Sequence, residues 1–306
     1  MSAVAAPSRK KQKEPDHQVS YPGQKHQNKW LTYGLLAFLS VAWLFPLVYA
    51  LAQSFRSYEY TQANGYLSLG GWTFDNYIDA WERGNMAQSF QNTLIITVPA
   101  VLLTLVLASM FAFVLSRYSF KFNLAMLALF LAANLLPPQS LLVPVFRMFL
   151  ATPVPEWLNP NGNMLNTHLG LILVNVAFQT GFCAFVLSNY MKTLPREMYE
   201  AAEVDGASVW RQYYQLTIPL VRPALAALAV LQTTWIYNEF FWATVLLQDS
   251  SKFPITSSLN NMRGTFFTDI NLVAAGSVII AIPTLVVFFV LRKQFVSGLT
   301  MGSAKG

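Results

Sequence analysis

Six long apolar stretches constrain this chain more than any other feature of its sequence. They cover residues 31–53, 93–115, 124–143, 169–187, 224–247 and 272–291. Each is close to the roughly 20 helical residues needed to cross a hydrocarbon core about 30 Å thick. Only helices and closed barrels satisfy their own backbone hydrogen bonds in lipid. The sequence therefore predicts an all-α integral membrane protein with six transmembrane helices.

The charged residues indicate how those helices are oriented. Charged residues make up only 11% of the chain, whereas soluble domains carry about 25%. The net charge is +6, but the basic residues are divided between one tail and short loops, which argues against a nucleic-acid-binding surface. If both ends are inside, 15 of the 20 Lys and Arg residues lie in inner segments, as the positive-inside rule requires. We therefore expect both termini in the cytoplasm and lipid around the helices.

Polar segments flank the expected transmembrane domain. Residues 1–30 are rich in Lys, Gln and Pro and are expected to form a flexible cytoplasmic tail. The apolar stretch that follows is 23 residues long, too long for a signal peptide, and ends without a small-residue cleavage site, so we expect a permanent anchor. The transmembrane domain then covers residues 31–291, and residues 292–306 form a C-terminal cytoplasmic tail.

Two stretches contain residues that disturb a helix in lipid. Pro137, Pro138 and Pro144 remove backbone donors from the third stretch and predict a kink, for bundle packing or for a pathway. Glu239 is the only acidic residue within a predicted span, so it has either a structural pairing or a role in gating or solute passage. The other polar groups able to line a path, or simply to join helices, are Asn134, Asn175, Gln179, Thr233 and Asn238.

An amphipathic helix is expected in the outer loop, over residues 73–84. Thr73 suits its start and Gly84 its end. Helical spacing places four apolar residues on one face: Phe74, Tyr77, Ile78 and Trp81. This helix serves either as an aromatic belt at the membrane surface or as part of a docking platform for an external partner.

The inner loop 190–220 is much longer than the connections usual between packed helices. Pro195 suits the first turn of a helix. Three glutamates favour the positive end of that helix: Glu197, Glu200 and Glu203. We expect the helix to run to about Val204 and to end at Asp205-Gly206, because glycine accepts the left-handed conformation.

A second short helix is predicted in the same loop. Ser208 can cap it, and Ile218-Pro219 is expected to end it. Four residues are predicted to share one face: Trp210, Tyr213, Tyr214 and Thr217. The small side chains of Ala201 and Ala202 permit close approach. Two helices bent at a glycine make a compact projection suited to a groove on a soluble partner.

Several kinds of chemistry have no motif in the sequence. It contains no G-x-x-x-x-G-K-[ST] segment, so no phosphate-binding P-loop and no cofactor are expected on this chain. His17, His26 and His168 lack the spacing of metal ligands. Cys183 is the single cysteine and has no partner for a disulfide. No enzymatic activity is therefore expected of this chain.

The inner loop resembles the EAA loop of bacterial ABC import permeases. Glu200-Ala201-Ala202, Asp205-Gly206-Ala207 and Ile218-Pro219 stand at that family's spacing. Other segments resemble its sugar-importing branch, which includes the smaller maltose permease subunit; they are Asn76-Tyr77, Gln91-Asn92-Thr93-Leu94, Pro137-Pro138-Gln139 with Pro144, Asn166-Thr167 with Gly170-Leu171, Leu194-Pro195, Asn238-Glu239-Phe240-Phe241-Trp242 and residues 298–306. The resemblance covers about residues 72–306.

The resemblance implies a type I ABC importer in a bacterial cytoplasmic membrane. It implies that this chain is a transport subunit that works with a second, usually different permease subunit, a dimeric ABC ATPase that binds ATP and Mg²⁺, and an extracytoplasmic solute-binding protein. The loop would be the coupling helix, with Glu200 facing basic or polar groups, Ala201 and Ala202 allowing close packing, and Gly206 forming the elbow. The remaining coupling residues would be Asp205, Ile218 and Pro219. The C-terminal residues in contact with the ATPase would be Thr300, Gly302, Lys305 and Gly306.

The expected function is carbohydrate import by alternating access, for a mono- or oligosaccharide. One rival is the same architecture importing a non-sugar solute such as an amino acid, a peptide or glycerol phosphate. A second rival is an ion-coupled secondary transporter or a membrane scaffold protein. Intramembrane charge is sparse and no inverted repeat is apparent, which disfavours the second rival.

Overall fold

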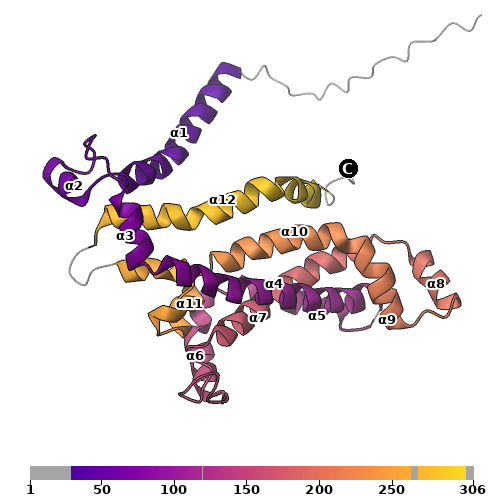
Figure 1. Ribbon diagram of the computed structural model, residues 1–306. Helices are drawn as coiled ribbons and strands as arrows, with labels where there is room; N and C mark the ends of the chain where they lie inside the picture. Colours follow the sequence, from indigo (N-terminus) through magenta and orange to yellow (C-terminus); the bar gives the residue numbers. More distant parts are fainter. Residues whose placement is uncertain (1–28, 119, 263–267, 301–306) are drawn as a thin grey trace, which may run out of the picture. The chain divides into compact units, whose positions relative to one another are not determined.

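The computed structural model describes residues 29–118, 120–262 and 268–300. Their regular structure is helical apart from two isolated β-bridges, which confirms the all-α prediction. The chain divides into two units, Met1–Tyr49 and Ala50–Gly306. The described part of the first unit is the greater part of helix α1 (Figure 1).

Within the described residues, five helices are long and apolar enough to cross a membrane. They are α1 (Lys29–Ser54), α4 (Met86–Arg117), α7 (His168–Met191), α10 (Ile218–Tyr237) and α12 (Ile270–Thr300). These helices match the first, second, fourth, fifth and sixth predicted spans. The helix α12 continues beyond residue 291, where the C-terminal tail was expected to begin.

The third predicted span is wrong in one respect, because it is not one continuous helix. It consists of α5 (Asn123–Leu135), the 3-10 helix η1 (Pro138–Leu141) and α6 (Leu142–Ala151). Leu136 and Pro137 between them are extended, with ψ of 129° and 128°. Each precedes a proline, whose ring disfavours the helical conformation of the residue before it. Pro144 lies in the first turn of α6. The N–H groups of a first turn have no acceptor within the helix, so the proline costs no helical hydrogen bond there.

The fifth span also differs from its prediction. The helix α10 ends at Tyr237, and a separate helix α11 (Phe241–Leu246) follows. At its other end α10 starts at Ile218, six residues before the predicted start at Ala224. The remaining short elements are α2 (Tyr58–Asn64), α3 (Asp75–Arg83), α8 (Arg196–Val204), α9 (Val209–Arg211), the π-helix η2 (Gln212–Thr217) and the 3-10 helices η3 (Ser250–Lys252) and η4 (Ser257–Met262).

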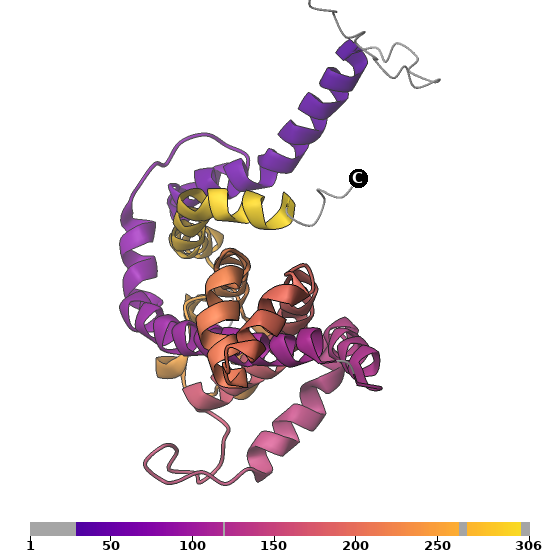
Figure 2. The same cartoon turned by 90° about the vertical axis from the view of Figure 1, so that its right-hand side faces the viewer.

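The helices α4, α7 and α10 form the centre of the second unit (Figure 1). One apolar cluster joins all three and includes Phe113, Leu187 and Val221. The helix α5 packs on α7 where Gly181 leaves room, because a Cβ there would lie 3.0 Å from the carbonyl oxygen of Phe130. The helix α6 and the loop after it lie to one side of these helices (Figure 2).

The predicted outer helix is confirmed as α3. The Thr73 hydroxyl accepts a hydrogen bond from the backbone N–H of Asp75 at 3.1 Å, and Gly84 follows the last residue. The buried face, however, is formed by Asn76 and Ala80. Three of the four residues expected to form the apolar face are exposed: Phe74, Ile78 and Trp81. The choice between a belt and a docking platform stays open.

A buried arginine organises the loop between α1 and α3. Only 1% of Arg56 is exposed. Its guanidinium donates hydrogen bonds to the carbonyl oxygens of Tyr66 at 2.9 Å, Gly65 at 3.2 Å and, through Nε, Gly70 at 3.2 Å. It also lies 5.6 Å from the ring centroid of Tyr60. One side chain thus satisfies backbone groups of a loop that has little regular structure.

We expect Arg56→Gln to lower the thermal unfolding midpoint of the detergent-solubilised chain. The shorter amide leaves several carbonyl oxygens unpaired, at a cost of about 1–3 kcal/mol for a buried unsatisfied group. The matched control is Arg83→Gln, because Arg83 is mostly exposed and pairs only with Asp79 one turn away. Equal midpoints for the two variants would show that Arg56 does not organise the loop.

Candidate coupling loop

The predicted first helix of the inner loop is confirmed as α8, and Pro195 occupies the position just before its first residue instead of lying in its first turn. The helix ends at a left-handed glycine, since φ of Gly206 is +75°. The N–H of Ala207 donates to the carbonyl of Ala202 at 2.9 Å, and the N–H of Gly206 to that of Glu203 at 3.0 Å. This pair of bonds is the Schellman motif, which explains why the elbow forms at a glycine.

The second helix begins as predicted but does not end as predicted. The Ser208 hydroxyl accepts a hydrogen bond from the backbone N–H of Arg211 at 3.4 Å. The helix α9 then passes through η2 directly into α10. Ile218-Pro219 therefore starts the long helix and does not terminate the short one.

A π-helical turn makes this continuity possible. The N–H of Ile218 donates to the carbonyl of Tyr213, five residues earlier. The Thr217 hydroxyl donates to the carbonyl of Gln212 at 3.0 Å. The turn lies just before Pro219, which has no N–H to continue an ordinary ladder. The wider turn and the threonine thus keep the carbonyls of Tyr213 and Gln212 paired just before the proline.

The π-turn also changes which side chains share a face. Thr217 is fully buried, whereas Trp210 is 65% exposed and Tyr214 is 63% exposed. The single face predicted for these residues is therefore wrong, because one extra residue per turn rotates Thr217 inward. Tyr213 is half-buried, and its hydroxyl is hydrogen-bonded to that of Ser109 in α4 at 2.8 Å.

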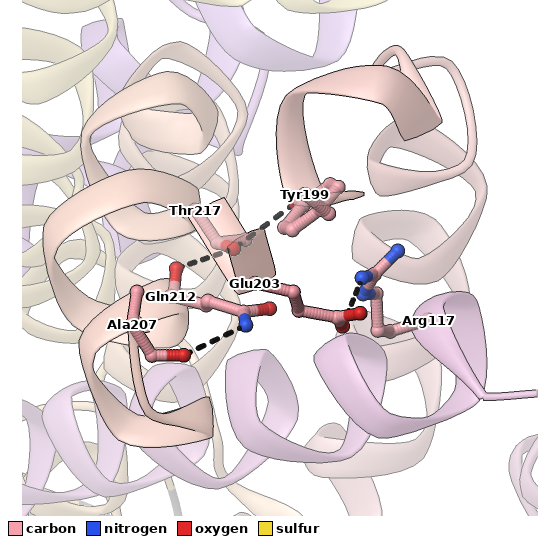
Figure 3. Close-up of polar contacts among 6 residues, drawn as sticks. All are labelled: Arg117, Tyr199, Glu203, Ala207, Gln212 and Thr217. Carbon is pink, nitrogen blue, oxygen red and sulfur yellow. Dashed lines mark hydrogen bonds and ion pairs between the residues drawn. The ribbon is translucent and has the colours of Figure 1, made fainter. Parts of the chain in front are cut away.

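An ion pair ties α8 to the end of α4 (Figure 3). Arg117 Nη2 and Glu203 Oε1 are 2.6 Å apart. The Arg117 guanidinium also lies 4.4 Å from the centroid of the Tyr199 ring. The arginine side chain is 13% exposed, so both contacts are partly shielded from water.

A chain of hydrogen bonds ties the same helix to the start of α10 (Figure 3). The Tyr199 hydroxyl is 3.0 Å from that of Thr217, which donates onward to the carbonyl of Gln212. The Gln212 amide donates to the carbonyl of Ala207 at 3.1 Å. Tyr199 is 5% exposed and belongs to the cluster that joins α4, α7 and α10. The loop is therefore anchored to helices that run the length of the second unit.

The opposite side of the loop is free of these anchors. Four of the predicted coupling residues are exposed there: Glu200, Ala201, Asp205 and Gly206. Exposed apolar groups accompany them, and Val204 is 88% exposed. We call the exposed residues Glu200, Ala201, Val204, Asp205, Gly206, Trp210 and Tyr214 the loop surface. Ala202 is half-buried behind it.

The predicted path residues do not form one polar site. They come from α5, α7, α10 and the break after α10, and no hydrogen bond joins any two of them. The amides of Asn134, Asn175 and Asn238 each donate to the carbonyl four residues earlier in the chain. Gln179 has a buried oxygen that accepts no hydrogen bond, and Thr233 is half-buried. Only Asn134 lines the apolar cavity of about 260 Å³ between α4, α5 and α7.

Glu239 lies in the break between α10 and α11, where its carboxylate has a structural pairing. The N–H groups of Trp242 and Ala243 donate to its two oxygens at 2.7 and 2.9 Å. These donors belong to the first turn of α11 and have no partner within the helix. Its own carbonyl accepts from the Thr256 hydroxyl at 2.8 Å. A role in solute passage stays a prediction.

Three polar residues of the resembling motifs anchor the segment after α11. The Asn92 amide donates to the carbonyls of Ser251 and Phe253 at 2.7 and 3.1 Å. Thr93 Oγ1 accepts from the N–H of Ile255 at 2.8 Å. Asn166 Oδ1 accepts the N–H groups of residues 248 and 249, both at 3.1 Å. These residues fix the end of the bundle opposite α8.

The C-terminal contact residues cannot be placed. Gly302, Lys305 and Gly306 lie outside the described residues, and Thr300 is the last residue of α12. Residues 1–28 of the expected N-terminal tail are likewise outside them.

We expect Arg117→Gln to loosen α8 without unfolding the bundle. Removing the guanidinium breaks both the ion pair with Glu203 and the contact with Tyr199. Amides 197–205 should then exchange with deuterium several times faster by mass spectrometry, because local opening becomes easier. The control Arg211→Gln removes an equal charge from the same loop, at an exposed side chain that forms no ion pair with the described residues. Unchanged exchange in Arg117→Gln would contradict the anchoring.

Comparison with known proteins places this chain in a transport family. Residues 93–299 match the family model described as "Binding-protein-dependent transport system inner membrane component". The melibiose/raffinose/stachyose import permease MelC of Bacillus subtilis is 32% identical over 76% of this chain and 82% of its own. The diacetylchitobiose uptake permease NgcG of Streptomyces coelicolor is 30% identical over 89% of this chain and 88% of its own.

A solved bacterial ABC transporter that imports alginate shares the fold. The matched chain has a TM-score of 0.70 and 22% identity, over 87% of this chain and 96% of its own. The fold, the apolar spans and the family match agree with one another. The chain is a multi-pass membrane protein that belongs to the family of inner membrane components of binding-protein-dependent ABC transport systems.

Proposed function

We propose that the chain is the permease subunit of an ATP-driven importer that carries a mono- or oligosaccharide by alternating access. The observation that carries this proposal is the inner loop, exposed on one side and anchored to α4 and α10 on the other. Such a loop transmits displacement to the spanning helices and binds no solute itself. The names of the relatives support a carbohydrate as cargo, since two of them import oligosaccharides.

The loop surface is where a dimeric ABC ATPase would bind. Small Ala201 lets a partner approach the α8 backbone, and Trp210 and Tyr214 offer apolar contact area beside it. Glu200 and Asp205 add negative charge for basic groups of the partner. ATP and Mg²⁺ would be held by that ATPase, and Thr300 with the residues after it would contact it as well.

The remaining partners follow from the family and from the distribution of basic residues. The loop end would face the cytoplasm, with both termini on that side. The opposite end, fixed by Asn92 and Asn166, would receive solute from the extracytoplasmic binding protein. A second permease, different from this one, would complete the path. Asn238 and Glu239 are the path candidates near that end, because both lie at the α10–α11 break, where Asn238 is exposed.

A substitution at the elbow tests the coupling role. We expect Gly206→Val to insert normally but to lose bound ATPase in pull-down and ATP-dependent uptake in proteoliposomes. Gly206 has φ of +75° with open space around it, so a β-branched residue strains the backbone without any clash. Gly162, with φ of +67° and the same open space, provides the matched control Gly162→Val away from the loop. Retained ATPase binding and uptake in Gly206→Val would exclude the coupling role.

The cargo and the energy source are tested on the assembled importer. Uptake should require ATP and the cognate binding protein, and that binding protein should bind an oligosaccharide when screened by calorimetry. Binding of glycerol phosphate, an amino acid or a peptide instead would favour the same architecture with another cargo. Solute flux through the purified chain alone, without ATP, would favour an ion-coupled transporter.

A further inference from the structure

A small basic pocket lies beside the anchored face of α8. Its volume is about 250 Å³, and its lining comes from the last residues of α4, the end of α7 and the start of α8. Three of the lining residues are cationic: Arg117, Lys192 and Arg196. The pocket is separate from the loop surface, because no residue of the loop surface lines it.

Two of the three charges in this pocket are unbalanced. Arg117 is neutralised by Glu203. Lys192 and Arg196 form no ion pair in the described part of the chain. Their side chains are exposed and carry ammonium and guanidinium donors. Guanidinium and ammonium groups together match the oxygens of a phosphate, where charge-assisted hydrogen bonds are strongest.

The position of the pocket in the fold indicates that the phosphate belongs to a lipid headgroup and is not a free ion. The spans α4 and α7 end at Arg117 and Met191, directly at the pocket, so it lies where a lipid headgroup would lie. Met191 and Leu194 add an apolar part to the lining, which suits the acyl-chain carbons of a lipid and has no counterpart in a free ion. In the proposed orientation this is the cytoplasmic surface, which attracts basic residues to anionic lipids.

We propose that this pocket binds the phosphate group of an anionic phospholipid, between Lys192, Arg196 and Arg117. A bound headgroup would join the ends of α4 and α7 to the start of α8 at the same place as the Arg117–Glu203 ion pair. The lipid would therefore hold the coupling helix against the bundle. The binding itself needs neither ATP nor a solute.

The test compares lipid retention by the purified full chain. The chain is placed in nanodiscs of phosphatidylcholine with one fifth phosphatidylglycerol, and bound lipids are counted by native mass spectrometry after release into detergent. Lys192→Gln with Arg196→Gln should weaken phosphatidylglycerol binding by about 25-fold, since each juxtamembrane cation contributes about fivefold. The control pair Arg211→Gln and Arg222→Gln removes the same charge outside the pocket and should retain the lipid.

Three results would overturn the proposal. The first is equal retention of phosphatidylglycerol by the pocket and control variants. The second is equal retention of phosphatidylcholine and phosphatidylglycerol by the unmodified chain. The third is complete displacement of the lipid by millimolar inorganic phosphate, which would assign the pocket to a free anion. Transport is not measured, so failure here leaves the proposed function standing.

Discussion

Backbone hydrogen bonding in lipid is the constraint on which the rest of this structure depends. Every interruption of a spanning helix must be satisfied from within the protein. At the α10–α11 break, the Glu239 carboxylate takes the two N–H groups that the new helix exposes. Before Pro219, the N–H of Ile218 and the Thr217 hydroxyl keep the carbonyls of Tyr213 and Gln212 paired within a π-turn. The polar residues in or next to the apolar spans are explained first by these local requirements.

Hydrogen bonding within the protein also explains why the inner loop has one anchored side and one exposed side. Tyr199 and Thr217 face inward and are hydrogen-bonded between α8 and the start of α10, and Arg117 ties α8 to α4. The Schellman turn at Gly206 satisfies the carbonyls at the end of α8, so no external partner is needed to hold its shape. A preformed projection loses little conformational entropy on binding. A displacement applied to its exposed side would move α4 and α10 together.

The features that could be predicted from the sequence depend on local periodicity or local chemistry. The apolar spans follow from hydropathy and length, and the turn at Gly206 follows from the demand for positive φ. The break at Pro137 could be predicted as a kink, but not as two separate helices. The continuous helix from α9 through Pro219 into α10 could not be predicted, because a π-turn has no periodic signature in a sequence.

The anchors of the loop could not be predicted for a different reason. Arg117 and Glu203 are 86 positions apart, and Asn92 and Ser251 are 159 apart, so only the packing of the helices brings them together. One signal was available for Arg117, since a basic residue at the end of a spanning helix commonly contacts the next polar segment. The sequence signal for Tyr199 is weaker, since it is only a lone aromatic residue among the glutamates of α8. Neither signal identifies its partner.

We propose the exposed side of the inner loop as the contact surface for the ATPase. Its most direct measurement is site-specific photocrosslinking in the assembled transporter, with a photoreactive residue at exposed Ala201 or, as a control, at exposed Ala151 in α6. We expect an ATPase crosslink from position 201, changed in yield by ATP, and none from position 151. Absence of the crosslink from position 201 in a complex that transports solute would contradict it.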